Sequence, residues 1–205
     1  MKDLLFVCIR NRVRSPFAEF LFRKMLEVRG DGLEEQIRVS SAGFEPAEFR
    51  ELMITKNISP PEPFYGVSMS EPTLSELRKR RIAPPEGWRS RELVPDDVKN
   101  SSLIIVALMQ QKQQLQVLFT EAAGKVFTTR EIAGREGLLT HEVFSLLPFD
   151  HSFWWFCEEN PDYVGKILSE MEEVLIDGFH TILRHLGIEA GDCLTPSRQR
   201  SNKIP

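Results

Sequence analysis

A cysteine and an arginine near the N-terminus are spaced to handle phosphate together. Cys8 ends a short apolar run, and Arg14 follows it six residues later. Backbone N–H groups in a loop that leads into a helix can form an anion-binding concavity, and the helix dipole adds partial positive charge there. An arginine at the helix start can bind two phosphoryl oxygens through its planar fork. The sequence therefore predicts a phosphate-binding loop formed by Ile9, Arg10, Asn11, Arg12, Val13, Arg14 and Ser15.

The same surroundings favour the thiolate, which is the nucleophilic form of a cysteine. A thiolate beneath a bound phosphoryl group can attack phosphorus and form a phosphocysteine. Ser15 can donate a hydrogen bond to that sulfur and stabilise it as a leaving group in the second step. A cysteine at the end of a buried strand can also be a simple core residue. The position of Cys8, between a strand and a helix, favours the catalytic interpretation.

A predicted strand and a predicted helix position this loop. Leu4–Cys8 is a continuous apolar run, typical of a central parallel strand that is buried on both faces. Arg14–Pro16 opens a helix, in which Ser15 or the loop before it can provide the N-cap and proline suits the first turn. Gly30 and Gly32 are expected to end that helix.

Strands and helices alternate along the rest of the chain, which indicates βαβ units and a parallel sheet. In such sheets the ligand lies outside the carboxyl ends of the strands, where Cys8 is placed. Residues 44–70 contain several prolines and are expected to be an irregular surface excursion. Further strands are predicted at Ile37–Ser41, Leu103–Met109 and Val126–Thr129, and further helices at Glu71–Arg81, Gln110–Phe119 and Pro161–Leu186.

The composition is that of an ordinary globular protein. The 205 residues carry a net charge of −4, so nothing points to nucleic acid or to an anionic membrane as a partner. Three cysteines without a close pair suit neither a disulfide framework nor a metal site, and they favour a reducing, cytoplasmic location. No segment has the roughly 18 apolar residues that a membrane span needs. We expect one domain over residues 1–190 and a mobile tail over 191–205.

The loop and its flanks resemble the start of the low-molecular-weight protein tyrosine phosphatases. Weaker similarities to that family follow in the same order along the chain and extend to about residue 185. The matching segments are Leu4–Cys8, Asn11, Arg14–Pro16, Ala18–Glu19, Phe22–Arg23, Val39–Gly43, Ser90–Leu93, Leu103–Met109 and Leu118–Gly124.

The resemblance implies an α/β fold, a three-layer αβα sandwich of the flavodoxin-like type with a four-stranded parallel sheet in the order 2-1-3-4. It implies hydrolysis of phosphomonoesters without metal or cofactor, with a phosphorylated protein or a small aryl phosphate as substrate and inorganic phosphate as product. Cys8 would attack phosphorus, and Arg14 would stabilise the transition state. Asn11 would hold the loop in its unusual backbone shape, with Ser15 and Ser41 as hydrogen-bond partners.

The mechanism needs a carboxylic acid to protonate the leaving oxygen. The family takes this acid from an Asp-Pro pair before the last helix, and this chain has no Asp-Pro. Asp150, followed by His151 and surrounded by aromatic residues, is the favoured candidate. Asp162 is the second candidate, and either aspartate could instead be an ordinary solvated residue. If Asp150 is the acid, the nearby Phe153 and Trp154 could wall a cleft for an aromatic ring.

Three further departures from the family concern the loop. Arg10 stands where the family usually has glycine, so it could strain the loop or add positive charge at its mouth. Val13 replaces a second cysteine, which excludes a disulfide within the loop. Trp88 replaces a histidine that supports the loop in many members.

These departures leave two alternatives to a phosphatase. One is a phosphate-binding pseudophosphatase without turnover. The other is an arsenate reductase on the same fold, which would need further cysteines in reach. Cys157 and Cys193 do not occupy the usual positions for that chemistry.

Overall fold

The computed structural model describes residues 1–55, 63–136 and 159–188. A parallel four-stranded sheet lies at its centre, with the strands in the order β2-β1-β3-β4. This architecture and strand order confirm the predicted fold. The strands are β1 Lys2–Cys8, β2 Ile37–Gly43, β3 Leu103–Val106 and β4 Val126–Thr128.

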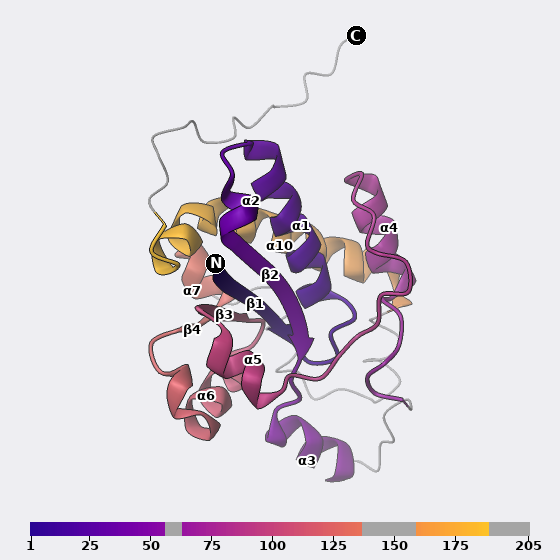
Figure 1. Ribbon diagram of the computed structural model, residues 1–205. Helices are drawn as coiled ribbons and strands as arrows, with labels where there is room; N and C mark the ends of the chain where they lie inside the picture. The colour runs from indigo at the N-terminus through magenta and orange to yellow at the C-terminus, as the bar shows by residue number, and fades with distance from the viewer. Residues whose placement is uncertain (56–62, 137–158, 189–205) are drawn as a thin grey trace.

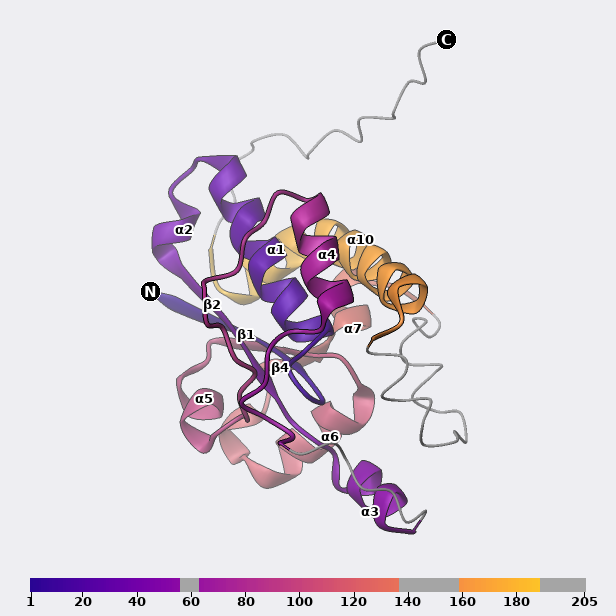
Figure 2. The ribbon, with the colours of Figure 1, turned by 90° about the vertical axis from the view of Figure 1, so that its right-hand side faces the viewer.

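Helices cover both faces of the sheet. Helices α1, α4 and α10 lie over one face and α5 and α6 over the other, whereas α3 stands apart beyond the end of β2 (Figures 1 and 2). None of the helices in the described ranges has the length and apolar character needed to cross a membrane. Their bounds are α1 Arg14–Arg29, α2 Leu33–Gln36, α3 Ala47–Thr55, α4 Glu71–Lys79, α5 Pro95–Asn100, α6 Met109–Leu118, η1 Thr120–Ala122, α7 Thr129–Ala133 and α10 Pro161–His185.

Strand β1 is apolar without interruption because its two faces pack into different cores. Leu4 and Phe6 belong to the larger core, formed with α1 and α10. Leu5 and Val7 belong to the smaller core, formed with α5 and α6. Successive side chains of a strand point to opposite faces, so a strand covered on both sides carries no polar alternation. Cys8 ends this strand, paired with Gly43 of β2.

Helix α1 begins and ends close to the predicted positions, but Ser15 does not cap it. The N-cap residue is Val13, and no side chain caps this end. The Ser15 hydroxyl instead lies 3.0 Å from the sulfur of Cys8. At the other end, Gly30 adopts φ 65°, a left-handed conformation that glycine takes without steric strain.

Two predicted elements were wrong in detail. The apolar run from Leu103 continues past β3, which ends at Val106, because Ala107 and Leu108 are buried against the phosphate-loop residues although they are not in the strand. Residues 44–70 are not wholly irregular, because α3 follows Pro46, whose carbonyl accepts the first helical hydrogen bonds.

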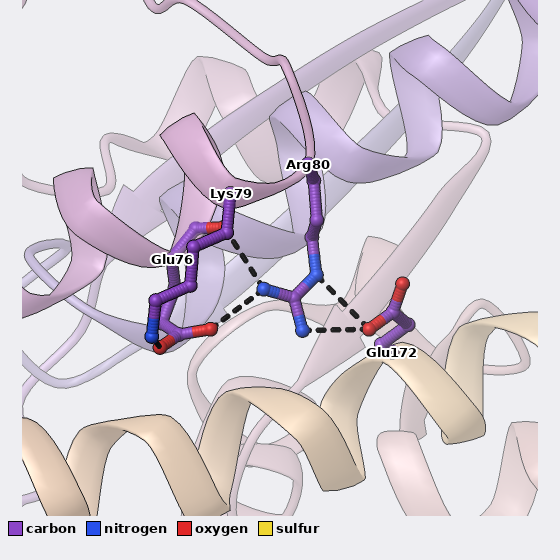
Figure 3. A network of polar contacts seen from close by, with 4 residues as sticks. All are labelled: Glu76, Lys79, Arg80 and Glu172. Atoms are coloured by element: carbon purple, nitrogen blue, oxygen red, sulfur yellow. Dashed lines mark hydrogen bonds and ion pairs between the residues drawn. The ribbon is translucent and has the colours of Figure 1, made fainter. Parts of the chain in front are cut away.

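A partly buried arginine at the C-terminal end of α4 joins this helix to α10 (Figure 3). The Arg80 guanidinium donates to Glu76 Oε2 at 2.7 Å and to Glu172 Oε2 at 2.7 and 2.9 Å. It also lies over the ring of Phe17 in α1, 5.1 Å from the centroid. The Arg80 side chain is only 17% exposed, so these interactions are shielded from water. One side chain therefore connects three helices, α1, α4 and α10, on this face of the sheet.

We expect Arg80→Met to lower the free energy of unfolding by about 1–3 kcal/mol, because two carboxylates lose their charge-assisted hydrogen bonds. Urea denaturation measures this difference. Arg78→Met is the matched control, since Arg78 pairs with Glu71 while both side chains are more than 60% exposed. That exposed pair should contribute less than about 1 kcal/mol. Equal losses in the two variants would contradict the assignment.

Candidate active site

The predicted phosphate loop, residues 9–15, runs from the end of β1 to the start of α1, and its residues other than Arg12 are buried. Cys8 is 3% exposed, and its sulfur lies 3.0 Å from Ser15 Oγ. Arg14 is the first residue of α1 and is also largely buried. The turn between strand and helix thus brings the thiol, the hydroxyl and the helix N-terminus together.

The side chain of Asn11 holds the loop at its centre. Asn11 has φ 53°, a conformation that asparagine tolerates better than most residues. Its Nδ2 donates to Ser15 Oγ at 2.9 Å and to Ser41 Oγ at 2.8 Å. Its Oδ1 accepts from the backbone N–H of Arg91 at 3.1 Å. One carboxamide therefore connects α1, β2 and the segment before α5.

A buried carboxylate continues this hydrogen-bond chain. Ser41 Oγ donates to Glu19 Oε2 at 2.6 Å, and Arg23 pairs with Glu19 Oε1 at 2.6 Å. Burial raises the pKa of Glu19, and the hydrogen bond from Ser41 and the charges of Arg23 and Arg91 oppose that rise in part. The burial effect is the largest, so the neutral form of Glu19 is favoured more than in water.

Three carbonyl groups at the loop accept from donors elsewhere in the protein. The acceptor–donor pairs are Cys8 O with Phe44 N (2.8 Å), Ile9 O with Tyr65 Oη (3.0 Å) and Arg12 O with Ser70 N (3.3 Å). In a planar trans peptide the N–H points opposite to the carbonyl, so the amides of residues 9, 10 and 13 are directed away from these donors. Val13 O accepts from Phe17 N (3.2 Å) in the first turn of α1, which leaves the Arg14 N–H at the open end of the helix. Amides in such an arrangement can bind an anion.

The other two arginines of the loop have partners of their own. Arg10 is 5% exposed and its guanidinium lies over the ring of Phe64, 5.1 Å from the centroid. The non-glycine residues with positive φ in the described ranges are Asn11 and Arg81, so Arg10 needs no glycine-like conformation. The expected strain from Arg10 is absent.

Arg12 lies at the other side of the loop. It donates to the carbonyl of Ser68 at 3.0 Å and pairs with Glu159 at 2.8 Å. Glu159 lies two residues before α10, so this ion pair brings the start of α10 close to the loop.

Apolar side chains surround the sulfur. Cys8, Ile9, Ala107 and Leu108 form a small buried cluster. The partly buried rings of Phe49, from α3, and of Phe64 pack against it. Residues of the 44–70 segment therefore form one wall beside the phosphate loop.

Several residues named from the sequence fall elsewhere. Asp150 lies outside the described residues, as do His151, Phe153, Trp154, Cys157 and Cys193. Asp162 lies exposed in the first turn of α10, three residues after Glu159. Trp88 lines a groove of about 310 Å³ with Leu74 and Pro84, while the loop contact from this part of the chain comes from the backbone of Arg91.

Tyr65, Glu19 and Glu159 were not identified as site residues from the sequence. The spacing of Glu19, four residues after Ser15 and four before Arg23, places all three on one face of α1 and could have indicated its role. Nothing local marks Tyr65, because it meets Ile9 from 56 residues away.

The described geometry agrees with comparisons to known proteins. Residues 3–56 match the sequence model of the family described as low molecular weight phosphotyrosine protein phosphatase. The resemblance seen in the sequence is thereby confirmed, and the matched segment contains the whole phosphate loop. No match was found among curated protein sequences.

Solved structures share the fold over most of the chain. A YwlE mutant from Bacillus subtilis is 25% identical, with a TM-score of 0.61, and the match covers 90% of this chain and 99% of that one. A YwlE arginine phosphatase with a phosphorylated active-site serine is also 25% identical, with a TM-score of 0.60 and coverage of 89% and 95%. A low molecular weight protein tyrosine phosphatase from T. tengcongensis is 22% identical, with a TM-score of 0.62 and coverage of 88% and 99%. The family match and the two structures of 25% identity support phosphatase activity, and the third structure shows the same fold.

The raised pKa of Glu19 predicts a pH-dependent contribution to stability. Between its unfolded and folded pKa values the folded chain holds a proton that the unfolded chain has lost. This contribution is complete below the unfolded value, near 4.5, and is lost as pH rises through the folded value. We expect the Tm of the wild type minus that of Glu19→Gln to decrease between pH 4.5 and pH 7.5 in thermal unfolding experiments.

Glu27→Gln is the control, because Glu27 lies on the same helix in an exposed pair with Lys24. The difference in Tm between the wild type and Glu27→Gln should change little over the same pH range. A wild-type advantage over Glu19→Gln that grows with pH would contradict a raised pKa.

Proposed function

We propose that this chain is a cysteine-dependent phosphatase that hydrolyses phosphomonoesters through a phosphocysteine on Cys8. The observation that carries the proposal is the Cys8–Ser15 contact of 3.0 Å, beside which the carbonyls of Cys8, Ile9 and Arg12 accept from donors outside the loop. The amides of residues 9–15 would bind the phosphoryl oxygens together with the guanidinium of Arg14. This chemistry needs no metal or cofactor.

In the first step the Cys8 thiolate attacks phosphorus in line with the ester oxygen. The S–P bond forms as the P–O bond to the leaving group breaks, and a carboxylic acid gives its proton to the departing oxygen. Arg14 and the loop amides would stabilise the charge on the three equatorial oxygens. A phosphocysteine and a free alcohol result.

In the second step water attacks the phosphocysteine. The carboxylate formed in the first step takes one proton from that water, and the S–P bond breaks to release phosphate and the thiolate. Ser15 has one hydroxyl proton, which can go to Cys8 Sγ or to the carbonyl of Ala42 at 3.3 Å. A thiolate can only accept, so the leaving sulfur would draw the Ser15 proton and be stabilised by it.

The acid that serves both steps is proposed to be Asp150, with Asp162 as the alternative. Asp162 lies in the first turn of α10, and Glu159, two residues before this helix, pairs with Arg12 of the loop. Because this ion pair brings the start of α10 close to the loop, Asp162 remains a candidate for the general acid. Asp150 remains the favoured general acid because in the sequence it precedes the last helix within an aromatic segment.

The favoured substrate is an aryl phosphate such as phosphotyrosine, in a protein or a small molecule. Phe49 and Phe64 pack on the cluster that contains Cys8, which offers an apolar wall to an aromatic ring. Phosphoarginine is the alternative, since the similar structures include arginine phosphatases. A reducing, cytoplasmic location would keep Cys8 as a thiol.

Purified protein should hydrolyse p-nitrophenyl phosphate in the presence of EDTA, and Cys8→Ser should lower kcat/KM by a factor of about 10⁴ or more, since the nucleophile is lost. Cys157→Ser is the control and should keep the activity. Rapid acid quenching should trap phosphate on Cys8. Activity retained in Cys8→Ser would exclude the mechanism, and phosphate binding without any hydrolysis would favour a pseudophosphatase. Phosphotyrosine and phosphoarginine peptides, assayed side by side, decide the substrate class.

The two candidate acids are separated by Asp150→Asn and Asp162→Asn. Loss of the general acid should lower kcat for p-nitrophenyl phosphate by about 10²–10⁴-fold and remove one limb of the pH profile of kcat. The other variant should retain both. A smaller loss with a better leaving group would identify the proton donor, and equal, modest effects would exclude both aspartates.

A further inference from the structure

Tyr65 is attached to the phosphate loop by its hydroxyl. Tyr65 Oη donates to the carbonyl of Ile9 at 3.0 Å. The ring lies against Gly43, where a Cβ atom would overlap the ring and come within 2.8 Å of the same carbonyl. Glycine at the end of β2 is therefore what lets Tyr65 reach the loop.

The segment that carries Tyr65 is itself anchored. Gly66 N donates to the carbonyl of Ser90 at 2.9 Å, and Ser90 N donates to the carbonyl of Val67 at 2.8 Å. The ring of Phe64 meets that of Tyr65 edge to face at 4.9 Å and lies beneath the guanidinium of Arg10. Tyr65 thus contacts the carbonyl of Ile9, and Phe64 contacts the side chain of Arg10.

The contact fixes the direction of one peptide group. With the carbonyl of Ile9 held outward against Gly43 and Tyr65, the N–H of Arg10 must point to the opposite side. We propose that Tyr65 is a positioning residue for the phosphate loop, one that aims the backbone N–H of Arg10 at a phosphoryl oxygen. This inference rests on the proposed phosphate-binding function and assigns to the 44–70 segment a part in it.

The hydroxyl is suited to remain a donor throughout turnover. Burial raises the pKa of Tyr65, and the negative charges of Glu92, Cys8 and Glu45 raise it further, while Arg50 lowers it. Tyr65 therefore keeps its proton when Cys8 is a thiolate. A carbonyl acceptor carries no proton of its own, so the bond to Ile9 can run in one direction only.

Tyr65→Phe tests the proposal, because it removes one oxygen and keeps the ring. Inorganic phosphate is titrated into ¹⁵N-labelled protein, and kcat/KM is measured on p-nitrophenyl phosphate. We expect the Kd for phosphate to rise about 3- to 10-fold, the scale of one hydrogen bond, with a similar fall in kcat/KM. The shift of the Arg10 amide resonance on phosphate binding should shrink more than those of residues 13 and 14. Tm should fall by only a few degrees.

Tyr163→Phe is the matched control, since it removes the chain's other tyrosine hydroxyl from a ring that packs on the main core. It should leave the Kd for phosphate unchanged. Gly43→Ala should weaken phosphate binding as Tyr65→Phe does, because the added methyl group displaces the ring although the hydroxyl remains.

The outcomes separate this inference from the proposed function. Wild-type protein that neither binds phosphate nor hydrolyses p-nitrophenyl phosphate overturns both. Wild-type activity with an unchanged Kd and Arg10 resonance in Tyr65→Phe overturns the role of Tyr65 alone. A third outcome is a weaker Kd with resonance shifts that shrink equally at all loop amides and a large fall in Tm. It would show that Tyr65 only stabilises the fold, and it also overturns the inference.

Discussion

Asn11 makes three side-chain hydrogen bonds from a left-handed backbone position, and the form of the phosphate loop depends on them. The conformation, with φ 53°, costs an ordinary residue about 1–2 kcal/mol. Each buried hydrogen bond contributes on the order of 1 kcal/mol, so the three together outweigh that cost. The carboxamide ties Ser15 of α1 to Ser41 of β2 across the loop. The place of the Ser15 hydroxyl beside Cys8 follows from this tie.

The hydrogen bonds around Asn11 also have a defined direction, and Glu19 sets it. An ionised carboxylate can only accept, so the proton of Ser41 goes to Glu19 and the Ser41 oxygen remains free to accept from Asn11. The second N–H of the same amide group is then available for Ser15, whose own proton stays available for Cys8. A charge one turn along α1 thereby influences which proton reaches the sulfur, although Glu19 does not touch the loop itself. Protonation of Glu19 would remove this constraint on Ser41.

The sheet and the long helices could be predicted because continuous apolar runs and helical spacing leave few alternatives. The position of the phosphate loop followed from its place between β1 and α1. Helices α2, α5 and α7 could not be recognised, since segments of four to six residues show no periodicity. The end of β3 was missed because burial of Leu108 continues the apolar run into a loop, where the side chain of Gln111 accepts from the Leu108 N–H as α6 begins. The role of Tyr65 could not be predicted from the sequence for another reason. Its contact with Ile9 joins residues 56 positions apart and depends on the whole fold, so its neighbours in the sequence give no indication of it.

Val13 and Arg10, which differ from the residues usual in the family, each pack against other parts of the protein. Val13 is 8% exposed and packs in the main core, so an apolar side chain at this position contributes to folding as well as excluding a second thiol. Arg10 is 5% exposed, and its guanidinium lies over the ring of Phe64. The ring that accepts Arg10 and the hydroxyl that holds Ile9 belong to adjacent residues, Phe64 and Tyr65. Position 10 and the segment that follows α3 are therefore one structural unit, and a glycine at position 10 would leave the Phe64 ring without the side chain that covers it.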